Sequence, residues 1–292
     1  DHIPEMIALI QNLMGKGVTY EKDGSIYFRV NQFQEYGRLS GNRPDSLMAG
    51  ARIDADEYEK EEATDFVLWK AKKEGEHFWE SELGDGRPGW HIECSAMAMK
   101  YLGPHFDIHC GGEDNIFPHH ENEIAQSEAA TGEKYVNYWL HCRHLLVDGE
   151  KMSKSKGNFF TLRDLIGKGF HPMAIRFFLV SSHYRTPVNL TMDGLKAAHA
   201  SWSRIMDFRG RLQELLRGDL AKEQLDILDE ERKRCEVRFE EYMDDDLDSP
   251  RAVAAIFDLI RETNRILDEH VPCNGQVSEI LNTLQRFDSV LG

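Results

Sequence analysis

The pattern that most constrains the fold is an alternation of helical and strand periodicities in the middle of the chain. Apolar residues recur at helical spacing over about residues 94–102 and 119–131, and each stretch is followed by a strand pattern, at 106–109 and at 136–147. A loop rich in glycine and proline, Gly84 to Gly89, precedes them. Strands that alternate with helices predict βαβ units, in which parallel strands form a doubly wound α/β sheet.

The periodicity changes after Asn158, where only helical patterns remain. Thr191 and Ser249 are suitable N-caps for two of the helices, and Pro250 suits a first helical turn. The last hundred residues are therefore expected to form an all-helical bundle without further strands. The helices are predicted at about 162–168, 172–181, 192–217, 226–243, 250–269 and 277–290.

The beginning of the chain predicts a helix followed by a β-hairpin. Val18–Tyr20 and Ile26–Val30 alternate in the manner of strands around Asp23-Gly24, a dipeptide that favours a two-residue hairpin turn. The helix is indicated by Pro4 and by apolar residues at helical spacing after it, which are Met6, Ile7, Ile10 and Leu13.

Charge is unevenly distributed along the chain. Residues 31–64 are polar, and their acidic run at 54–62 predicts a solvated loop within an insertion. Over the whole chain, 35 Lys and Arg against 51 Asp and Glu give a net charge of −16. This balance argues against a non-specific nucleic-acid binder, although a local basic face could still contact a phosphate backbone.

Composition places the chain among ordinary globular proteins. Its 292 residues suggest about two domains at roughly 150 residues each, and a hydrophobic content of 41% excludes disorder. No run approaches the roughly 18 apolar residues of a membrane span, and no export signal is visible, so we expect no membrane partner. An odd set of cysteines without framework spacing favours a reducing compartment, by default the cytoplasm. The cysteines are Cys94, Cys110, Cys142, Cys235 and Cys273.

Cys94 and the segment 111–123 contain the donor atoms of a zinc site. Pro118 marks a helix start, so His119 and Glu123, four residues apart, are expected on one helical face. Thiolate, imidazole and carboxylate are zinc ligands. Spacing does not choose between His119 and His120, and the plainer interpretation is a buried cysteine beside a surface His/Glu pair.

A lysine-rich string, Lys151 to Asn158, follows a strand and the turn at Asp148-Gly149. Its lysines could neutralise the charge that moves onto a departing pyrophosphate, and its small residues let the backbone approach phosphates. Loops of this composition are also commonly just solvated.

A third candidate site lies just past the strand that ends at His109. Ligands of open α/β sheets bind beyond the carboxyl ends of strands, where the carboxylate of Asp114 could accept the hydroxyls of a ribose. Trp90 would lie near the same edge. A glycine pair, Gly111-Gly112, is equally an ordinary turn, and Trp90 and His109 could be core residues.

Together these strings resemble the cysteinyl-tRNA synthetases, a family of class I aminoacyl-tRNA synthetases. Gly86 to Met97 resembles the zinc-cysteine segment of the family, and Phe117 to Gln126 resembles its His/Glu zinc helix. Lys151 to Ser155 resembles the family's Lys-Met-Ser-Lys-Ser signature, and Met243 to Asp246 before Ser249-Pro250 is similar to its helical domain.

The resemblance implies ATP-dependent activation of L-cysteine to cysteinyl-adenylate and transfer to the terminal adenosine of tRNA(Cys). It implies one Zn²⁺ per chain, Mg²⁺ with ATP, and a monomer. A zinc-bound thiolate would discriminate cysteine from serine, whose hydroxyl is a poorer ligand. The residues it assigns are Cys94, His119 and Glu123 to zinc, Trp90 and His109 to cysteine, Gly111, Gly112, Asp114 and Lys154 to ATP, and Lys151 and Lys154 to catalysis.

The resemblance also implies an arrangement of domains. Residues 1–17 would be the last helix of the first Rossmann half, and 18–64 a connective insertion with the hairpin and the acidic loop. The second Rossmann half, with the zinc site and the signature loop, would span 65–158. Stem-contact helices at 159–190 and a helical bundle on the tRNA-binding side at 191–292 would follow.

The chain departs from the family's pattern at several points. The His-Ile-Gly-His phosphate-binding string does not occur, and in the family it lies in the first half of the nucleotide fold, downstream of a further zinc cysteine. The family usually continues beyond the position of Gly292 into an anticodon-recognising segment. Cys110 stands where many members have glycine. We therefore expect a fragment that is inactive alone.

Two other functions fit the same strings. A paralogous ligase would adenylate cysteine and pass it to an amino sugar, and a non-catalytic zinc- or RNA-binding remnant would have lost the chemistry. The retained Lys151 and Lys154 argue against a remnant. Basic residues of two predicted helices could face tRNA or pair with nearby glutamates; they are Arg204, Arg209, Arg211, Arg217, Arg232, Lys233, Arg234 and Arg238.

Overall fold

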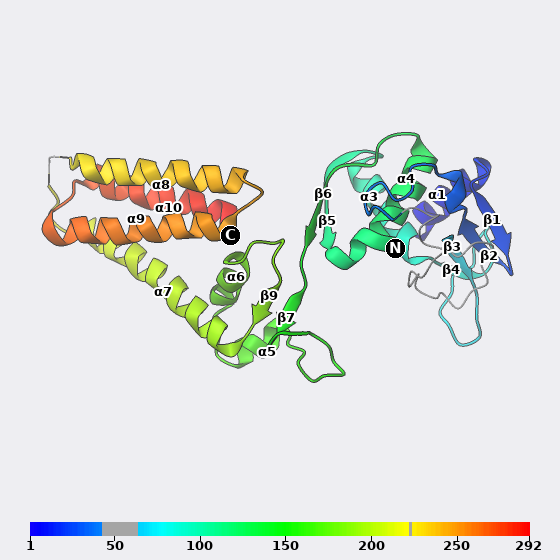
Figure 1. Cartoon of the computed structure of the whole chain (residues 1–292), viewed down its shortest axis with the longest axis horizontal. Coiled ribbons are helices and arrows are strands. Elements are labelled where there is room, and N and C mark those ends of the chain that lie inside the picture. The colour runs from blue at the N-terminus through cyan, green and yellow to red at the C-terminus, as the bar shows by residue number, and fades with distance from the viewer. Residues whose placement is uncertain (43–63, 222–223) are drawn as a thin grey trace. The chain divides into compact units, whose positions relative to one another are not determined.

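A computed structural model describes residues 1–42, 64–221 and 224–292 of the chain. The chain forms two compact units, Asp1–Cys142 and Arg143–Gly292 (Figure 1). The division falls inside the range 65–158 that was expected to form one domain, and the lysine-rich loop at 151–158 belongs to the second unit. The acidic run at 54–62 lies outside the described residues.

The first unit contains an antiparallel sheet whose strands follow chain order. The predicted hairpin is confirmed, and its turn places Asp23 and Gly24 at φ 52° and 73°, as a two-residue turn of this type requires. The strands are β1 (Thr19–Lys22), β2 (Ser25–Phe28), β3 (Phe66–Ala71) and β4 (Gly86–Pro88).

Strand β4 lies where the sequence predicted only a loop, so that prediction was wrong. Its glycines allow close approach to β3: a Cβ at Gly86 would lie 2.3 Å from the Lys70 carbonyl oxygen, and one at Gly89 would lie 2.0 Å from that of Val67. The glycines therefore serve strand packing as well as chain reversal.

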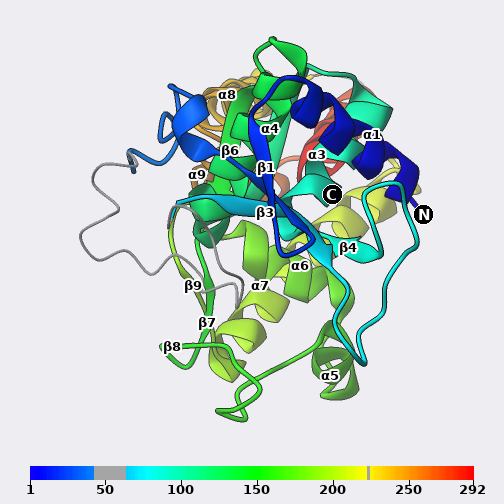
Figure 2. The ribbon, with the colours of Figure 1, turned by 90° about the vertical axis from the view of Figure 1, so that its right-hand side faces the viewer.

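Three helices of the first unit pack on one another, with α1 against both α3 and α4 (Figure 2). The amphipathic helix predicted at the start of the chain is confirmed, and its Ile10 and Leu13 are fully buried with Leu68 and Trp69 of β3. The helices are α1 (Ile3–Gly15), α3 (Trp90–Leu102) and α4 (Glu121–Thr131).

The predicted βαβ unit is also confirmed. Strands β5 (Phe106–Gly112) and β6 (Val136–Cys142) are parallel, and α4 connects them. Among the described residues this parallel sheet has two strands. Strand β5 extends to Gly112 rather than ending at His109, because Gly111 and Gly112 still pair with His141 and Cys142. The strand predicted at 136–147 is two strands.

The second unit begins with a small mixed sheet. Strands β7 (Leu145–Val147) and β8 (Glu150–Lys151) form a hairpin, and β9 (Val188–Leu190) pairs in parallel with β7. Strand β9 contradicts the expectation that no strand follows Asn158. Three residues are too few to show a period, and this strand forms only through a partner some forty residues away.

Six helices are described in the second unit, at positions close to those predicted. Their largest core gathers side chains of α7, α8, α9 and α10, among them Leu212, Phe239, Leu259 and Phe287. None of the described helices is long and apolar enough to span a membrane. The helices are α5 (Leu162–Gly167), α6 (Pro172–Val180), α7 (Met192–Leu215), α8 (Asp226–Asp244), α9 (Ser249–Glu269) and α10 (Asn274–Leu291).

Of the two predicted N-caps, one is confirmed, and the other lies one residue earlier than predicted. The Thr191 hydroxyl accepts the Gly194 N–H at 3.0 Å. At α9 the cap is Asp248, whose carboxylate accepts the Arg251 N–H at 3.1 Å, and Ser249 is already helical. Both residue types can cap, and spacing alone does not distinguish neighbours.

Candidate metal and nucleotide site

The structure brings Cys94, His119 and Glu123 together. Their donor atoms all lie within 4.8 Å of one another. Cys94 belongs to α3, whereas His119 lies in the turn before α4 and Glu123 in the first turn of α4. His119 and Glu123 share a face, as their spacing predicted, and His119 Nε2 lies 3.0 Å from Glu123 Oε1.

The carboxylate of Glu123 is the most deeply buried group of this cluster. It is 0% exposed, and its Oε1 lies 3.0 Å from His119 Nε2 and 3.4 Å from His109 Nε2. Burial alone would raise its pKa, but the neighbouring imidazoles of His109 and His119 lower it to about 2. A buried, ionised carboxylate surrounded by imidazoles is suited to coordinate a cation, because a buried charge needs a partner.

Cys94 supplies the soft donor of the set. Burial, together with the charges of Glu123 and Glu93, raises the pKa of the Cys94 thiol to about 11. The thiol is therefore protonated without a metal, and a bound cation would displace the proton. A thiolate, an imidazole and a carboxylate fit zinc.

A second group of donors overlaps the first at Glu123. It adds His109 and His120, whose ligand atoms lie within 4.8 Å of each other and of the carboxylate. His120 Nδ1 also lies 2.8 Å from His141 Nε2, and burial lowers the pKa of His120 to about 3. Only the group with His119 contains a thiol, so the two histidines belong to groups with different donor atoms.

Trp90 and His109 lie beside these donors. The Trp90 ring centroid is 4.7 Å from that of His119, and the side chain is 54% exposed, so Trp90 is not a core residue. The His109 ring lies 4.8 Å from both His120 and Trp139, and its Nε2 is 3.4 Å from Glu123 Oε1.

Close packing explains why glycines occupy the two positions at the end of β5. A Cβ at Gly111 would lie 2.6 Å from His120 Cε1, and one at Gly112 would lie 2.5 Å from Asp114 Oδ1. Asp114 lies in the turn that follows the strand and is exposed. This edge is thus open at Asp114 and closely packed at Gly111.

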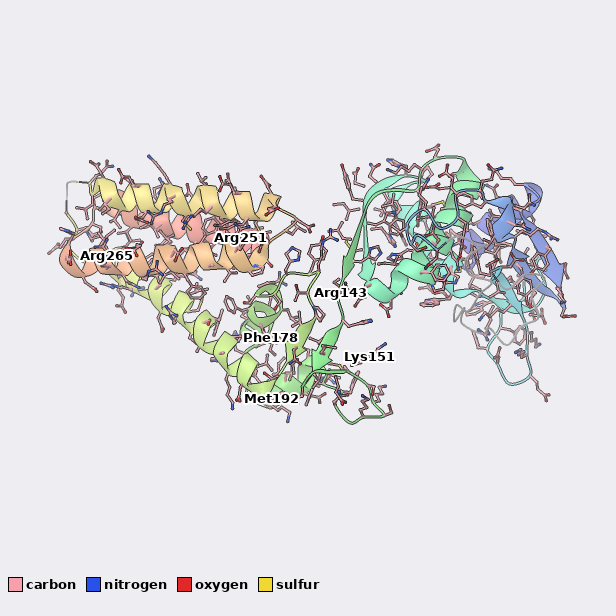
Figure 3. All side chains as sticks on the ribbon, viewed as in Figure 1. Arg143, Lys151, Phe178, Met192, Arg251 and Arg265 are labelled. Atoms are coloured by element: carbon pink, nitrogen blue, oxygen red, sulfur yellow. The ribbon has the colours of Figure 1, made fainter. Side chains whose placement is uncertain are left out.

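In the second unit, the lysine-rich string forms a loop after β8, and Figure 3 labels Lys151 where the loop begins. Asn158 closes the loop: its Oδ1 accepts the Ser153 N–H at 2.8 Å, and its Nδ2 donates to the Lys151 carbonyl at 3.2 Å. Lys156 is paired with Glu150 at 2.9 Å. In the described part of the chain, Lys154 has no carboxylate partner and lies 5.5 Å from the Phe159 ring.

Several residues that support the site were not found from the sequence. His91 Nδ1 lies 2.9 Å from His119 Nδ1, and the Tyr135 hydroxyl donates to Glu123 Oε2 at 3.4 Å. Glu121 is fully buried, and its carboxylate accepts the N–H groups of Gly37 and Ser40 at 2.9 and 2.8 Å. One indication of His91 and Glu121 was present in the sequence: both are polar residues within the strings that resemble the family.

Most arginines of the predicted basic helices pair with nearby acids or amides. Arg211 donates to Asn264 and Asp268, each at 2.7 Å. The Arg232 side chain lies 2.8 Å from Glu236, and Arg238 lies 3.3 Å from Asp258. Arg234 pairs with Glu231. These contacts favour the interpretation of solvated ion pairs for these four arginines.

Comparison with known families identifies the fold. The profile of the tRNA synthetase class I (C) catalytic domain matches residues 1–200. The chain belongs to this family. A second profile, that of the DALR domain, matches residues 238–292. The fold is thus a class I synthetase α/β catalytic fold followed by a helical DALR domain, as the resemblance implied.

Curated relatives are named cysteine–tRNA ligases. The protein from Brachyspira hyodysenteriae is 49% identical over 298 residues, covering 100% of this chain and 62% of the relative. That from Koribacter versatilis is 49% identical over 291 residues, covering 99% and 58%. The chain therefore spans about three fifths of the length of these relatives.

Solved structures show the same fold at low identity. A chain assigned as an arginyl-tRNA synthetase from Campylobacter jejuni superposes with a TM-score of 0.60 at 14% identity, covering 100% of this chain and 61% of that chain. The LeuRS of a ternary complex with tRNA and LeuAMS, from Agrobacterium radiobacter, gives 0.54 at 14% identity, covering 77% and 32%.

Proposed function

We propose that this chain is part of a cysteine–tRNA ligase, which activates L-cysteine with ATP and transfers it to the terminal adenosine of tRNA(Cys). The observation that carries the proposal is the convergence of the Cys94 thiol and the His119 imidazole on the fully buried, ionised carboxylate of Glu123. The names of the curated relatives support it.

The three donors would hold one Zn²⁺. When bound, the metal supplies a thiophilic Lewis acid that binds a cysteine side chain better than a serine hydroxyl. Trp90 and His109 lie beside the donors and would enclose the substrate side chain. His109 would also keep Glu123 ionised through its proximity, because its imidazole lowers the carboxyl pKa.

Activation would proceed by attack of the cysteine carboxylate on the α-phosphorus of ATP. An oxygen–phosphorus bond forms as the bond between the α-phosphorus and the α–β bridging oxygen breaks, and pyrophosphate leaves with the electron pair. Mg²⁺ bound with ATP would share the charge of the pyrophosphate. Lys151 and Lys154 would stabilise that departing charge. Gly111, Gly112 and Asp114 would bind the nucleoside, with the Asp114 carboxylate accepting ribose hydroxyls. Transfer follows when an adenosine hydroxyl attacks the adenylate carbonyl and AMP leaves.

Domain roles follow from the same family membership. We assign residues 1–17 to the end of the first Rossmann half and 18–64 to a connective insertion. The second Rossmann half would span 65–158, and stem-contact helices would span 159–190. The range 191–292, which contains the DALR match, would face tRNA.

The proposal is tested by ATP–pyrophosphate exchange and by tRNA charging, both measured with the full-length gene product. Cysteine-dependent exchange together with charging of tRNA(Cys) is the expected result. Exchange without charging would instead identify a ligase that passes cysteine to another acceptor. A protein without exchange would be a non-catalytic remnant and would contradict the proposal.

A further inference from the structure

A buried polar cluster connects the two helices that carry the metal donors. Gln126 of α4 donates from Nε2 to the His91 carbonyl at 2.7 Å and to Ser95 Oγ at 2.6 Å, both on α3. Ser127 Oγ adds a bond to Ser95 Oγ at 2.9 Å. Gln126, Ser95 and Ser127 are all 0% exposed.

Each of these bonds lies next to a metal donor. Ser95 follows Cys94 in the chain, and the ring of His91 contacts the ring of His119 at 2.9 Å between the two Nδ1 atoms. Gln126 lies three residues after Glu123 on α4. One amide group therefore holds the parts of α3 that supply Cys94 and support His119.

The orientation of the amide follows from its partners. The His91 carbonyl can only accept, so the nitrogen of Gln126 must face it. Its Oε1 is left buried without a hydrogen-bond partner among the described residues. Burying this oxygen without a hydrogen bond costs free energy. An apolar side chain at position 126 could pack the two helices without that cost, so helix packing alone does not explain the glutamine.

We propose that Gln126 is a positioning residue for the metal site. Its two hydrogen bonds hold the first turns of α3 against the start of α4, and so set the spacing between Cys94 and the pair His119 and Glu123. This inference rests on the proposed zinc site. Groups that orient metal ligands in this way typically change metal affinity about 10–100-fold when they are removed.

The test compares two buried glutamines, one in each unit. Gln126→Met keeps the length of the side chain and removes its donor. Gln276→Met is the matched control, because Gln276 is 2% exposed and bonds to Leu225 and Asp229 in the second unit. Both variants of the 292-residue chain are titrated with Zn²⁺ against a chromophoric chelator and with Co²⁺, whose visible spectrum reports ligand geometry.

We expect Gln126→Met to weaken Zn²⁺ binding about 10–100-fold and to change the Co²⁺ spectrum. Gln276→Met should lower the melting temperature and leave both metal measurements unchanged. If Gln126→Met does not fold, Ser95→Ala, which removes one of the two acceptors, should weaken Zn²⁺ binding by a smaller factor.

Two outcomes would overturn the role of Gln126. One is wild-type affinity and spectrum in Gln126→Met, or in Ser95→Ala where only that variant folds. The other is an equal loss of Zn²⁺ affinity in both glutamine variants, which would indicate general destabilisation. A wild-type chain that binds no Zn²⁺ would overturn the proposed zinc site itself, and this result is distinct from the other two.

Discussion

Cys94, His119 and Glu123 show how far single residues could be predicted from the sequence. The donor types and the shared face of His119 and Glu123 followed from composition and helical spacing. The choice between His119 and His120 did not, because both precede the same helix and only tertiary contacts separate them. The roles of Gln126 and Tyr135 could not be predicted either, because their contacts form only when segments distant in the sequence pack together.

The first residue-level prediction concerns Cys94. Replacing it with serine should abolish binding of about one Zn²⁺ per chain, because a hydroxyl is a weak zinc ligand near neutral pH. Metal analysis of the purified protein measures the stoichiometry. Cys235→Ser, in the buried core of the second unit, should retain the metal. Stoichiometric zinc in Cys94→Ser would place the site elsewhere.

A second prediction at this scale concerns Lys154. In the full-length protein, Lys154→Ala should slow adenylate formation about a hundredfold, about 3 kcal/mol of transition-state stabilisation, with a smaller change in ATP affinity. Pre-steady-state kinetics separates the two effects. Lys156→Ala is the control, because Lys156 pairs with Glu150. Near-normal adenylation by Lys154→Ala would exclude this role.

At the scale of elements, long periodic helices were predicted well, whereas two strands of three residues were missed. The α8 and α9 helices were predicted to within about a residue at each end, because each buries a regular apolar face. Strands β4 and β9 are three residues long, so they carry too little pattern to be distinguished from loops. Their existence depends on the partner strand.

The corner between α8 and α9 leads to a prediction at this scale. The Asp246 carboxylate accepts hydrogen bonds from the Tyr184 hydroxyl at 2.6 Å and from Arg185 Nε at 2.6 Å. These bonds lower the pKa of Asp246 to about 2, and the bond from Arg185 has the larger effect. Asp246 and Leu247 both have positive φ, at 56° and 57°, so the corner has an unusual backbone that these bonds help to hold.

A carboxyl whose pKa is lowered by folding stabilises the native state above its unfolded pKa of about 4. That stabilisation is lost as the pH falls through about 2. Asp246→Asn should therefore unfold at lower urea than the wild type at pH 7, and the difference should shrink between about pH 4 and pH 2. Asp219→Asn, at an exposed side chain, should leave the midpoint unchanged. A difference that stays constant with pH would contradict this assignment.

At the scale of the whole molecule, the fold was predicted because the signature strings occur in family order. The synthetase structures that share it are only 14% identical to this chain, so the fold persists where most of the sequence does not. The sequence could not predict where the two compact units divide, because the strand pattern continues across Cys142 and Arg143. The proposed metal donors lie in the first unit and the signature loop in the second.

The most direct test of the central claim is zinc X-ray absorption of the 292-residue chain with and without its proposed substrate. The claim is that a metal held by Cys94, His119 and Glu123 binds the thiol of the substrate cysteine. The spectrum should gain one zinc–sulfur contact, at about 2.3 Å, when L-cysteine is added, and no such contact with L-serine. A zinc environment that L-cysteine leaves unchanged would contradict the account.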